Sequence, residues 1–367
     1  MSDTPGDQLT DPVATLRGRI DALDQEIQRL ISDRARLAVE MRTAKGPQAQ
    51  TVDYYRPERE AQVLRAVVDR NDGPLKDEEM VRLFREIMSA CLAQQEPLRI
   101  AFLGPEGTFS QSASIKHFGH SIKSLPLNTI EEVFSEVEAG DADFGVVPVE
   151  NSTEGAVSNT LDMFIASPLR ICGEVELRIH QHLLTTASSL DGIERVYSHR
   201  QSLAQCRGWL HANLPHAEKI PVASNAEAAR RVRYAEDAAA IAGEAAASVY
   251  DLNILHANIE DQADNTTRFF VVGRQLLAPS GHDKTSMLLS STDQPGLLYH
   301  LLEPLAGCGV DMTRIESRPS KTGKWDYVFF IDVEGHADEE PLGSALRRLQ
   351  TVASLCKVLG SYPVATI

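Results

Sequence analysis

The spacing of apolar residues divides the chain into three segments, the first of which is helical. Between residues 13 and 45 apolar side chains recur at steps of three and four, the period of an α-helix. Neither proline nor glycine interrupts Ile20 to Lys45, so we expect one long helix that ends at the following glycine and proline. Shorter helices are expected over about residues 57–69 and 77–95. A helix of about 30 residues cannot bury its apolar stripe against two short helices, so we expect it to pair with another chain.

From residue 97 onward, short strand-like runs alternate with helix-like runs. The strand-like runs include RIAFLG (99–104), FGVVPVE (144–150), RVYSH (195–199) and RFFVV (268–272). Such alternation predicts an α/β fold with largely parallel sheets. Residues 274–283 form a candidate linker, and the pattern beyond it reads strand, helix, strand, strand, helix, strand, the ferredoxin-like order. The prediction is a multidomain chain: all-α over 1–96, α/β over 97–275 and α+β over 284–367.

Charge and composition narrow the classes of function. The formal net charge is −16 and none of the three segments is basic, which argues against nucleic acid as a partner. The five cysteines are far apart and form no CxxC pair, a usage typical of reduced thiols in a cytoplasmic protein rather than of disulfides or zinc. No apolar run approaches the ~20 residues of a membrane span, and the acidic amino-terminal residues do not resemble a secretory signal.

Four polar stretches stand at the ends of predicted strands in the middle segment. They are GPEGTFS (104–110), PVENSTEGAV (148–157), YSHRQSLAQC (197–206) and DNTTRFF (264–270). Each alone could be turn and helix-capping chemistry. Four of them, all at strand ends, favour one shared crevice. Because DNTTRFF holds hydroxyls and an arginine but no cysteine, its chemistry would depend on hydrogen bonds and charge.

The first segment resembles the all-helical chorismate mutases over its whole length, through LRGRIDALDQEIQRLISDRARLAVEMRTAK, YYRPERE and LFREIMSACLAQQ. Arg34 and Lys45 are about three helical turns apart and share a face, whereas Arg17 points roughly 100° away. The resemblance implies an intertwined dimer in which Arg17 serves the partner's site. It assigns the substrate carboxylates to Arg34 and Arg59, the ether oxygen to Lys45 and Gln95, and the substrate hydroxyl to Glu60. Cys91 stands where the family usually has serine.

The four polar stretches together resemble prephenate dehydratase over about residues 97–275. The resemblance implies two α/β lobes with the site in the cleft between them and Thr267 as the essential catalytic threonine. It also implies a set of substrate-binding residues: Thr108, Ser110, Glu150, Asn151, Ser198 and Gln205. We expect Arg268, next to Thr267, to bind a substrate carboxylate. The resemblance implies no metal and no cofactor.

Both implied reactions suit these residue types. Conversion of chorismate to prephenate is a pericyclic rearrangement, which needs a folded substrate and positive charge near the breaking C–O bond. Arginine and lysine supply that charge. Prephenate then loses CO₂ and its hydroxyl as an aromatic ring forms. A threonine hydroxyl can donate a hydrogen bond to the leaving oxygen.

The last segment resembles the ACT regulatory domains of phenylalanine-sensitive dehydratases over about residues 284–363. Two motifs carry the resemblance, GLLY (296–299) and ESRP (316–319). They imply an allosteric phenylalanine site formed by Gly296, Leu297, Glu316, Ser317 and Arg318. That segment lies beyond the last dehydratase motif, so we expect a chain cut after Gln275 to keep dehydratase chemistry.

The sequence thus predicts a cytoplasmic enzyme with both activities, inhibited by phenylalanine, that forms a homodimer or a dimer of dimers. A rival interpretation is a monofunctional prephenate dehydratase with a helical dimerisation arm. The mutase-like residues Arg34, Lys45, Glu60 and Gln95 weigh against it. Another is an amino-acid-binding regulator, since two-lobed clefts and ACT domains both serve as sensors. The presence of Thr267 and the absence of a basic DNA-reading helix weigh against that one.

Overall fold

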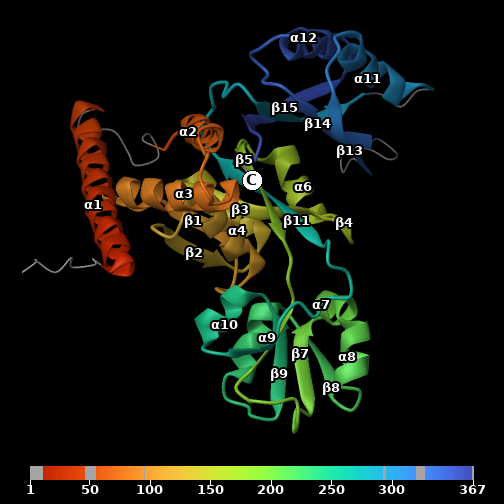
Figure 1. Ribbon diagram of the computed structural model, residues 1–367. Coiled ribbons are helices and arrows are strands. Elements are labelled where there is room, and N and C mark those ends of the chain that lie inside the picture. Colours follow the sequence, from red (N-terminus) through yellow and green to blue (C-terminus); the bar gives the residue numbers. More distant parts are fainter. Residues whose placement is uncertain (1–10, 46–54, 95, 292–294, 320–326, 366–367) are drawn as a thin grey trace, which may run out of the picture.

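The computed structural model describes residues 11–45, 55–94, 96–291, 295–319 and 327–365. A helical part, a two-lobed α/β part and a carboxy-terminal four-stranded sheet with two helices follow one another along the chain (Figure 1). The predicted fold class is confirmed. The helical part and the carboxy-terminal domain both lie against the first lobe, and the second lobe extends away from them.

The helical part consists of α1 (Pro12–Lys45), α2 (Pro57–Asp69) and α3 (Asp77–Ala93). The helices α2 and α3 pack on each other and on the first lobe, and α1 stands at their end as a projecting arm (Figure 1). Its apolar stripe is open to solvent: Leu23 and Leu37 are each 63% exposed. The single chain therefore leaves the predicted stripe uncovered.

The first lobe is a six-stranded sheet in which β2, β1, β3, β11 and β5 follow in that order and the short β4 pairs with β3. The strands are β1 (Arg99–Leu103), β2 (Lys123–Leu127), β3 (Phe144–Asn151), β4 (Gly155–Ala156), β5 (Arg170–Arg178) and β11 (Thr266–Gly273). The helices are α4 (Phe109–Phe118), α5 (Ile130–Ala139) and α6 (Ser158–Ala166).

The second lobe is a five-stranded sheet in the order β10-β6-β9-β7-β8. Its strands are β6 (His182–Thr185), β7 (Arg195–His199), β8 (Glu218–Val222), β9 (Ala238–Ala242) and β10 (Asn253–His256). Its helices are α7 (Arg200–Gln205), α8 (Arg207–Asn213), α9 (Asn225–Val232) and α10 (Glu244–Tyr250). The chain enters this lobe after β5 and returns from it in β11, so the two strands run side by side in opposite directions.

The prediction of largely parallel sheets is wrong, because both sheets are mixed. In the first lobe β1 pairs in parallel with β2 and β3, whereas β11 is antiparallel to both β3 and β5. In the second lobe β7 pairs in parallel with β8 and β9, and β6 is antiparallel to β9. The returning strand β11 enters the first sheet from the other lobe, and its direction is therefore opposite to that of β3.

The carboxy-terminal domain has the predicted ferredoxin-like order. Its elements are β12 (Asp283–Ser290), α11 (Leu297–Gly307), β13 (Met312–Pro319), β14 (Tyr327–Glu334), α12 (Leu342–Val352) and β15 (Leu355–Pro363), and its sheet runs β13-β14-β12-β15. The helices α11 and α12 cover one face of this sheet. The other face packs on the first lobe: Leu288, Phe330 and Tyr362 share a hydrophobic core with Phe164 and Phe270.

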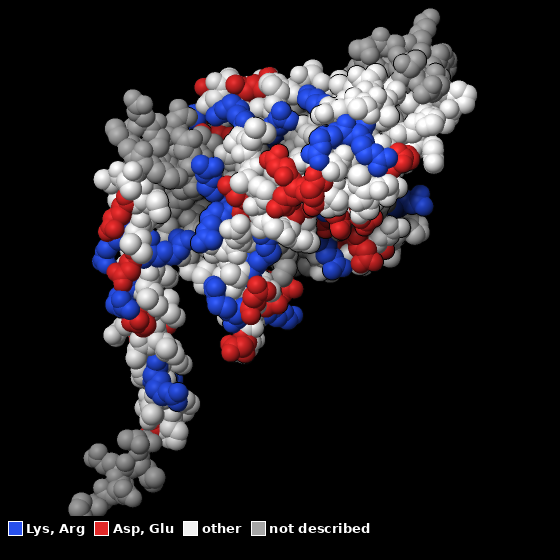
Figure 2. Space-filling view, turned by 90° about the horizontal axis from the view of Figure 1, so that it is seen from above, with Lys and Arg blue, Asp and Glu red and all other residues white. Residues whose placement is uncertain are grey.

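On the face shown in Figure 2, acidic and basic side chains are interspersed over the body and over α1, without one broad patch of either sign. Among the described residues, no helix is both long and apolar enough to cross a membrane.

Candidate active sites

A cavity of about 190 Å³ lies between the two lobes of the α/β part. All four polar stretches contribute to it, as the sequence predicted. The lining residues are Thr108, Phe109, Asn151, Ile179, His199, Gln201, Ser202, Gln205, Ala223, Ser224, Asn225, Asn265 and Thr267. The cavity has a hydroxyl- and amide-rich wall, and no Lys, Arg, Asp or Glu is among the described residues that line it.

Thr267 and Asn151 form the central contact of this cavity. They face each other across β11 and β3, and the Asn151 Nδ2 donates a hydrogen bond to the Thr267 Oγ1 at 2.8 Å. The Asn151 Oδ1 accepts from the backbone N–H and the hydroxyl of Thr153, which fixes the orientation of the amide. Because the Thr267 oxygen accepts this hydrogen bond, its own proton is free to be donated to a ligand in the cavity.

Asn265 is a site residue that the sequence interpretation did not single out, although it lies inside DNTTRFF. It is only 2% exposed, and its Oδ1 accepts a hydrogen bond from Asn151 at 2.8 Å. Its Nδ2 is buried without a hydrogen-bond partner in the described structure, at the wall of the cavity. Since buried donors are nearly always satisfied, this amide group is poised for a polar group of a ligand.

The helices α4 and α9, one from each lobe, begin at the cavity wall, as does the six-residue α7, whose N-cap is His199. Thr108 is the N-cap of α4 and Ser224 is the N-cap of α9, and both line the wall. Free backbone N–H groups and the helix dipole at such ends attract anions. Together with Asn265, they can hold carboxylates in a cavity whose described lining carries no lysine or arginine side chain.

Three more of the predicted dehydratase residues take up different positions. Gln205 lines the cavity and its Nε2 lies 3.4 Å from the Thr153 Oγ1, so it links the two lobes. Ser198 is fully buried behind the wall, where its Oγ lies 2.9 Å from the Asn225 Oδ1 and 2.7 Å from the Ile241 carbonyl oxygen. Ser110 is buried in the first turn of α4. Ser198 and Ser110 therefore support the cavity without lining it.

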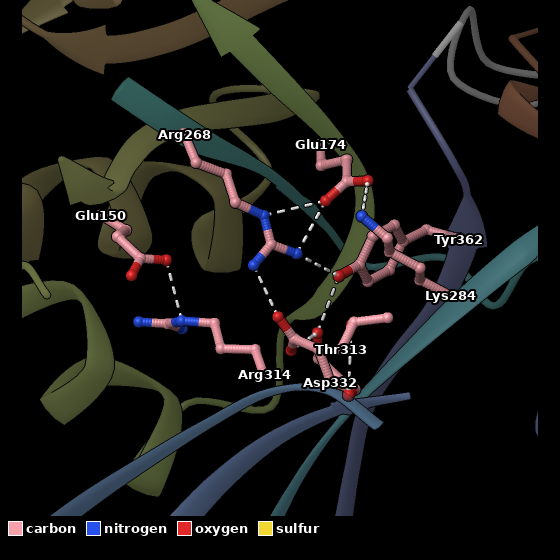
Figure 3. A network of polar contacts seen from close by, with 9 residues as sticks. Glu150, Glu174, Arg268, Lys284, Thr313, Arg314, Asp332 and Tyr362 are labelled. Carbon is pink, nitrogen blue, oxygen red and sulfur yellow. Dashed lines mark hydrogen bonds and ion pairs between the residues drawn. The ribbon is translucent and has the colours of Figure 1, made fainter. Parts of the chain in front are cut away.

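Arg268 does not reach the cavity, which corrects its assignment as a carboxylate ligand. Side chains alternate between the faces of a strand, so Arg268 points away from the face that carries Thr267. Its guanidinium pairs with Glu174 at 2.7 Å and with Asp332 of the carboxy-terminal domain at 2.5 Å (Figure 3). Glu150 is also absent from the cavity lining, and it pairs with Arg314 at 2.8 Å.

The helical part holds a second cavity, of about 400 Å³. Four residues that the chorismate mutase resemblance singled out line it: Arg34 from α1, Arg59 and Glu60 from α2, and Cys91 from α3. Phe118, Ser121 and Ile122 of the first lobe close one side. The Lys45 side chain and Gln95 lie outside the described residues. Arg17 is exposed on α1, roughly 25 Å along the helix axis from Arg34.

Glu60 sits in a setting that perturbs its ionisation. Burial raises the pKa of its carboxyl to about 7, against the opposing effects of Arg85 and Tyr55. The Arg85 Nε lies 3.6 Å from the Glu60 Oε1, and the Tyr55 hydroxyl contacts the His117 Nε2 of the first lobe at 3.2 Å. Arg85 was not predicted, because its role depends on how α3 packs against α2. A carboxyl that titrates near neutral pH can exchange hydrogen bonds with a substrate hydroxyl.

The predicted phenylalanine residues are divided between two faces of the carboxy-terminal sheet. Gly296 adopts the left-handed conformation (φ 81°) as the N-cap of α11, and Leu297 begins that helix. Ser317 pairs with Phe329, which faces the helices, whereas Glu316 pairs with Phe330, which faces the first lobe. Arg318 also turns to the lobe and pairs with Asp162 at 3.2 Å. Strand alternation therefore prevents Glu316, Ser317 and Arg318 from lining one pocket of a single chain.

Known families match all three parts of the chain. The chorismate mutase type II family matches residues 16–96, the prephenate dehydratase family residues 100–276 and the ACT domain family residues 285–350. A bifunctional chorismate mutase/prephenate dehydratase from Stutzerimonas stutzeri is 55% identical over 97% of this chain and 99% of its own length. The chain belongs to the bifunctional chorismate mutase/prephenate dehydratase family.

Solved structures resemble nearly three quarters of this family member. A prephenate dehydratase from Arthrobacter aurescens, in complex with L-Phe, superposes with a TM-score of 0.67 at 35% identity. The match covers 72% of this chain and 90% of that one. GqqA, described as a novel type of quorum quenching acylase, superposes with a TM-score of 0.68 at 32% identity, covering 73% of this chain and 98% of its own.

Proposed function

We propose residue roles for the two activities of this enzyme of phenylalanine biosynthesis. It rearranges chorismate to prephenate in the helical cavity and converts prephenate to phenylpyruvate, CO₂ and water in the cleft between the lobes. Phenylalanine inhibits it through the ACT domain. The observation that carries the dehydratase assignment is the Asn151–Thr267 hydrogen bond at the wall of a cleft without acidic, lysine or arginine side chains among its described lining residues.

In the dehydratase step Thr267 donates its free proton in a hydrogen bond to the leaving hydroxyl of prephenate. The ring carboxylate departs as CO₂, its electron pair enters the ring, and the C–O bond to the hydroxyl breaks. His199 is the titratable side chain among the described lining residues, and we assign to it the proton that turns the leaving hydroxide into water. The amino-terminal ends of α4 and α9, with the Asn265 Nδ2, hold the carboxylate of the pyruvyl side chain.

In the mutase step no proton moves and no nucleophile attacks. Arg34 and Arg59 grip the two carboxylates of chorismate, and Glu60 accepts a hydrogen bond from its hydroxyl. Lys45 and Gln95 stabilise the negative charge that develops on the ether oxygen as the C–O bond breaks, as the family resemblance implies. Arg85 holds the Glu60 carboxyl in place.

A second copy of the chain completes the mutase site. The apolar stripe of α1 is exposed in the single chain, and packing against an antiparallel α1 of another chain would bury it. That packing would also bring the other chain's Arg17 to the cavity. We therefore propose a homodimer, alone or within a dimer of dimers. The proposed domain bounds are 1–96, 97–275 and 284–367. The five cysteines are all unpaired, which supports a place in the reducing cytoplasm.

Two variants test the assignment of two separate sites. Arg34→Ala should lose conversion of chorismate but keep conversion of added prephenate, because Arg34 lines only the helical cavity. Thr267→Val should do the reverse and let prephenate accumulate from chorismate. Both are followed by the absorbance of chorismate and phenylpyruvate. If one folded variant lost both activities equally, the two-site assignment would be wrong.

A further inference from the structure

The strand pair β3–β11 carries the dehydratase residues on one face and interdomain ion pairs on the other. Thr267 stands opposite Asn151 in the register, and Arg268 stands opposite Glu150. The first pair lines the cleft, whereas the second pair faces the ACT domain. The residues on the two faces are neighbours in the chain, so a displacement of Glu150 or Arg268 moves Asn151 or Thr267 with it.

Five charged residues form what we call the interdomain clamp: Glu150, Glu174, Arg268, Arg314 and Asp332 (Figure 3). Arg268 joins Glu174 of β5 to Asp332 of β14, and Glu150 of β3 pairs with Arg314 of β13. In the Glu150–Arg314 pair the Glu150 side chain is 36% exposed and that of Arg314 is 12%. The two pairs of Arg268 are more shielded from water: the Glu174 side chain is 1% exposed and that of Asp332 is 5%. Charges buried in this way are held firmly by their partners, because separating them leaves a charge without solvation.

The strand β13 carries both Arg314 of this clamp and the ESRP motif (316–319), which the ACT resemblance assigns to the phenylalanine site. Its residues alternate, so Arg314 and Arg318 face the dehydratase lobe whereas Ile315 and Ser317 face the side of the sheet that carries the helices. Arg318 also forms an ion pair with Asp162 of α6. Because β13 is the edge strand, only β14 holds it in the sheet. A ligand that shifts the outer face of β13 therefore acts on Arg314 and Arg318 at once.

We propose that Glu150 and Arg314 are positioning residues for the dehydratase reaction, and that their ion pair transmits the state of β13 to Asn151 and Thr267. This inference rests on the proposed function of the cleft. In one arrangement of β13, the Arg314–Glu150 ion pair holds β3 in the position in which Asn151 orients the Thr267 hydroxyl toward the cleft. An effector that favours another arrangement lowers turnover without touching the cleft, as allosteric coupling requires two states with different affinities.

Glu150→Gln and Arg314→Gln test the proposal in the full-length enzyme. Each keeps the length and hydrogen-bonding capacity of the side chain as far as glutamine allows but removes the charge. We expect the dehydratase kcat to fall at least about fivefold with little change in KM, because the lining of the cleft is intact. Phenylalanine should still bind, as measured by calorimetry, yet inhibit much less. The double variant should be no worse than either single one, since both remove the same pair.

Charge reversal and a surface control make the outcome decisive. The exchange Glu150→Arg with Arg314→Glu should recover part of the kcat that each single reversal loses. Arg347→Gln breaks an exposed pair with Glu340 beside α12 and should leave both kcat and inhibition unchanged. The proposal is overturned if the folded glutamine variants keep full kcat and full inhibition, if their losses add, or if Arg314→Gln abolishes phenylalanine binding itself. Failure of the proposed function would look different, because Thr267→Val would then turn over prephenate normally.

Discussion

Thr267 and Arg268 are adjacent in the chain but act in different parts of the molecule. The family resemblance placed Thr267 in the dehydratase site, and Arg268 was expected there because it is next to Thr267 in the chain. The period of two that predicts the strand also places its neighbouring side chains on opposite faces. Applied to DNTTRFF, that rule would have separated Arg268 from Thr267 and grouped Asn265 with Thr267. The partners of Arg268, Glu174 and Asp332, are 94 and 64 residues away, and no local pattern predicts those contacts.

Thr267→Val isolates the contribution of the hydroxyl, since valine keeps the shape and the strand preference. The dehydratase kcat should fall at least ~100-fold, the scale of losing a hydrogen bond made to the leaving group in the transition state. Thr266→Val is the matched control, because the Thr266 side chain does not line the cleft. If Thr267→Val turned over prephenate at a near-normal rate, Thr267 would not be catalytic and DNTTRFF would have a structural role only.

The raised pKa of Glu60 predicts a pH-dependent stability. Burial raises that pKa from 4.5 to about 7, so the folded state favours the protonated carboxyl. This stabilisation is complete below about pH 4.5 and is lost as the pH rises through 7. It amounts to on the order of 3 kcal/mol. Glu60→Gln mimics the protonated form at every pH. The Tm of Glu60→Gln minus the Tm of the parent should therefore be larger at pH 8.5 than at pH 5.5.

Thermal unfolding at the two pH values, followed by circular dichroism, measures the effect. Glu339→Gln, an exposed carboxyl of the ACT domain, serves as the control and should show an equal Tm difference at both pH values. A Tm difference for Glu60→Gln that stays constant with pH would contradict the assigned pKa.

At the scale of elements, the long helix α1 illustrates what periodicity can and cannot predict. The repeat of apolar residues predicted its length, and the glycine and proline that follow Lys45 predicted its end, because a helix needs only local signals. Which surface covers its stripe depends on a contact that one chain does not make. The sheets show the same limit: strand positions follow from β-branched runs, whereas the reversal of β11 follows from the route of the chain through the second lobe.

Subunit mixing tests the shared mutase site. In the proposed shared site, Arg17→Ala and Arg34→Ala chains each lack one residue that every homodimeric site would need, so each alone should be inactive. In a mixed dimer one site receives Arg34 from the first variant and Arg17 from the second, and it is intact. Full exchange should therefore restore about a quarter of the mutase activity, since about half the dimers are mixed and half their sites are complete.

Mixing Arg34→Ala with Arg59→Ala provides the matched control for that experiment. Both residues line the cavity of one chain, so every site of a mixed dimer carries one defect and no activity should return. Equal recovery in the two mixtures, or none in the first after exchange is confirmed by mass spectrometry, would count against a site shared between chains.

At the scale of the whole molecule, the order of domains was predictable but their mutual dependence was not. The sequence placed the ACT part beyond a linker, which suggested that a chain cut after Gln275 keeps its dehydratase chemistry. In the structure the ACT sheet shares a core with the first lobe through Leu288, Phe330 and Tyr362. Removing it would expose that core and leave the buried Arg268 and Glu174 without Asp332 and Lys284. We therefore expect the shortened chain to unfold at lower temperature and to lose dehydratase activity.

Gly360 offers a way to disturb this docking without removing any charge or domain. It lies in β15, where a Cβ would collide with the backbone of Ile171 in β5, which has no flexible end that could move aside. Gly360→Ala should therefore push the ACT sheet away from the first lobe and loosen the interdomain clamp. We expect a lower Tm, a lower dehydratase kcat and weaker inhibition by phenylalanine, while chorismate conversion stays normal.

Gly73→Ala is the control, since a Cβ there meets only the Asn71 side chain at 3.9 Å. Hydrogen exchange of β5 and β15 locates the effect: faster exchange confined to the mutase helices would contradict the docking role of Gly360.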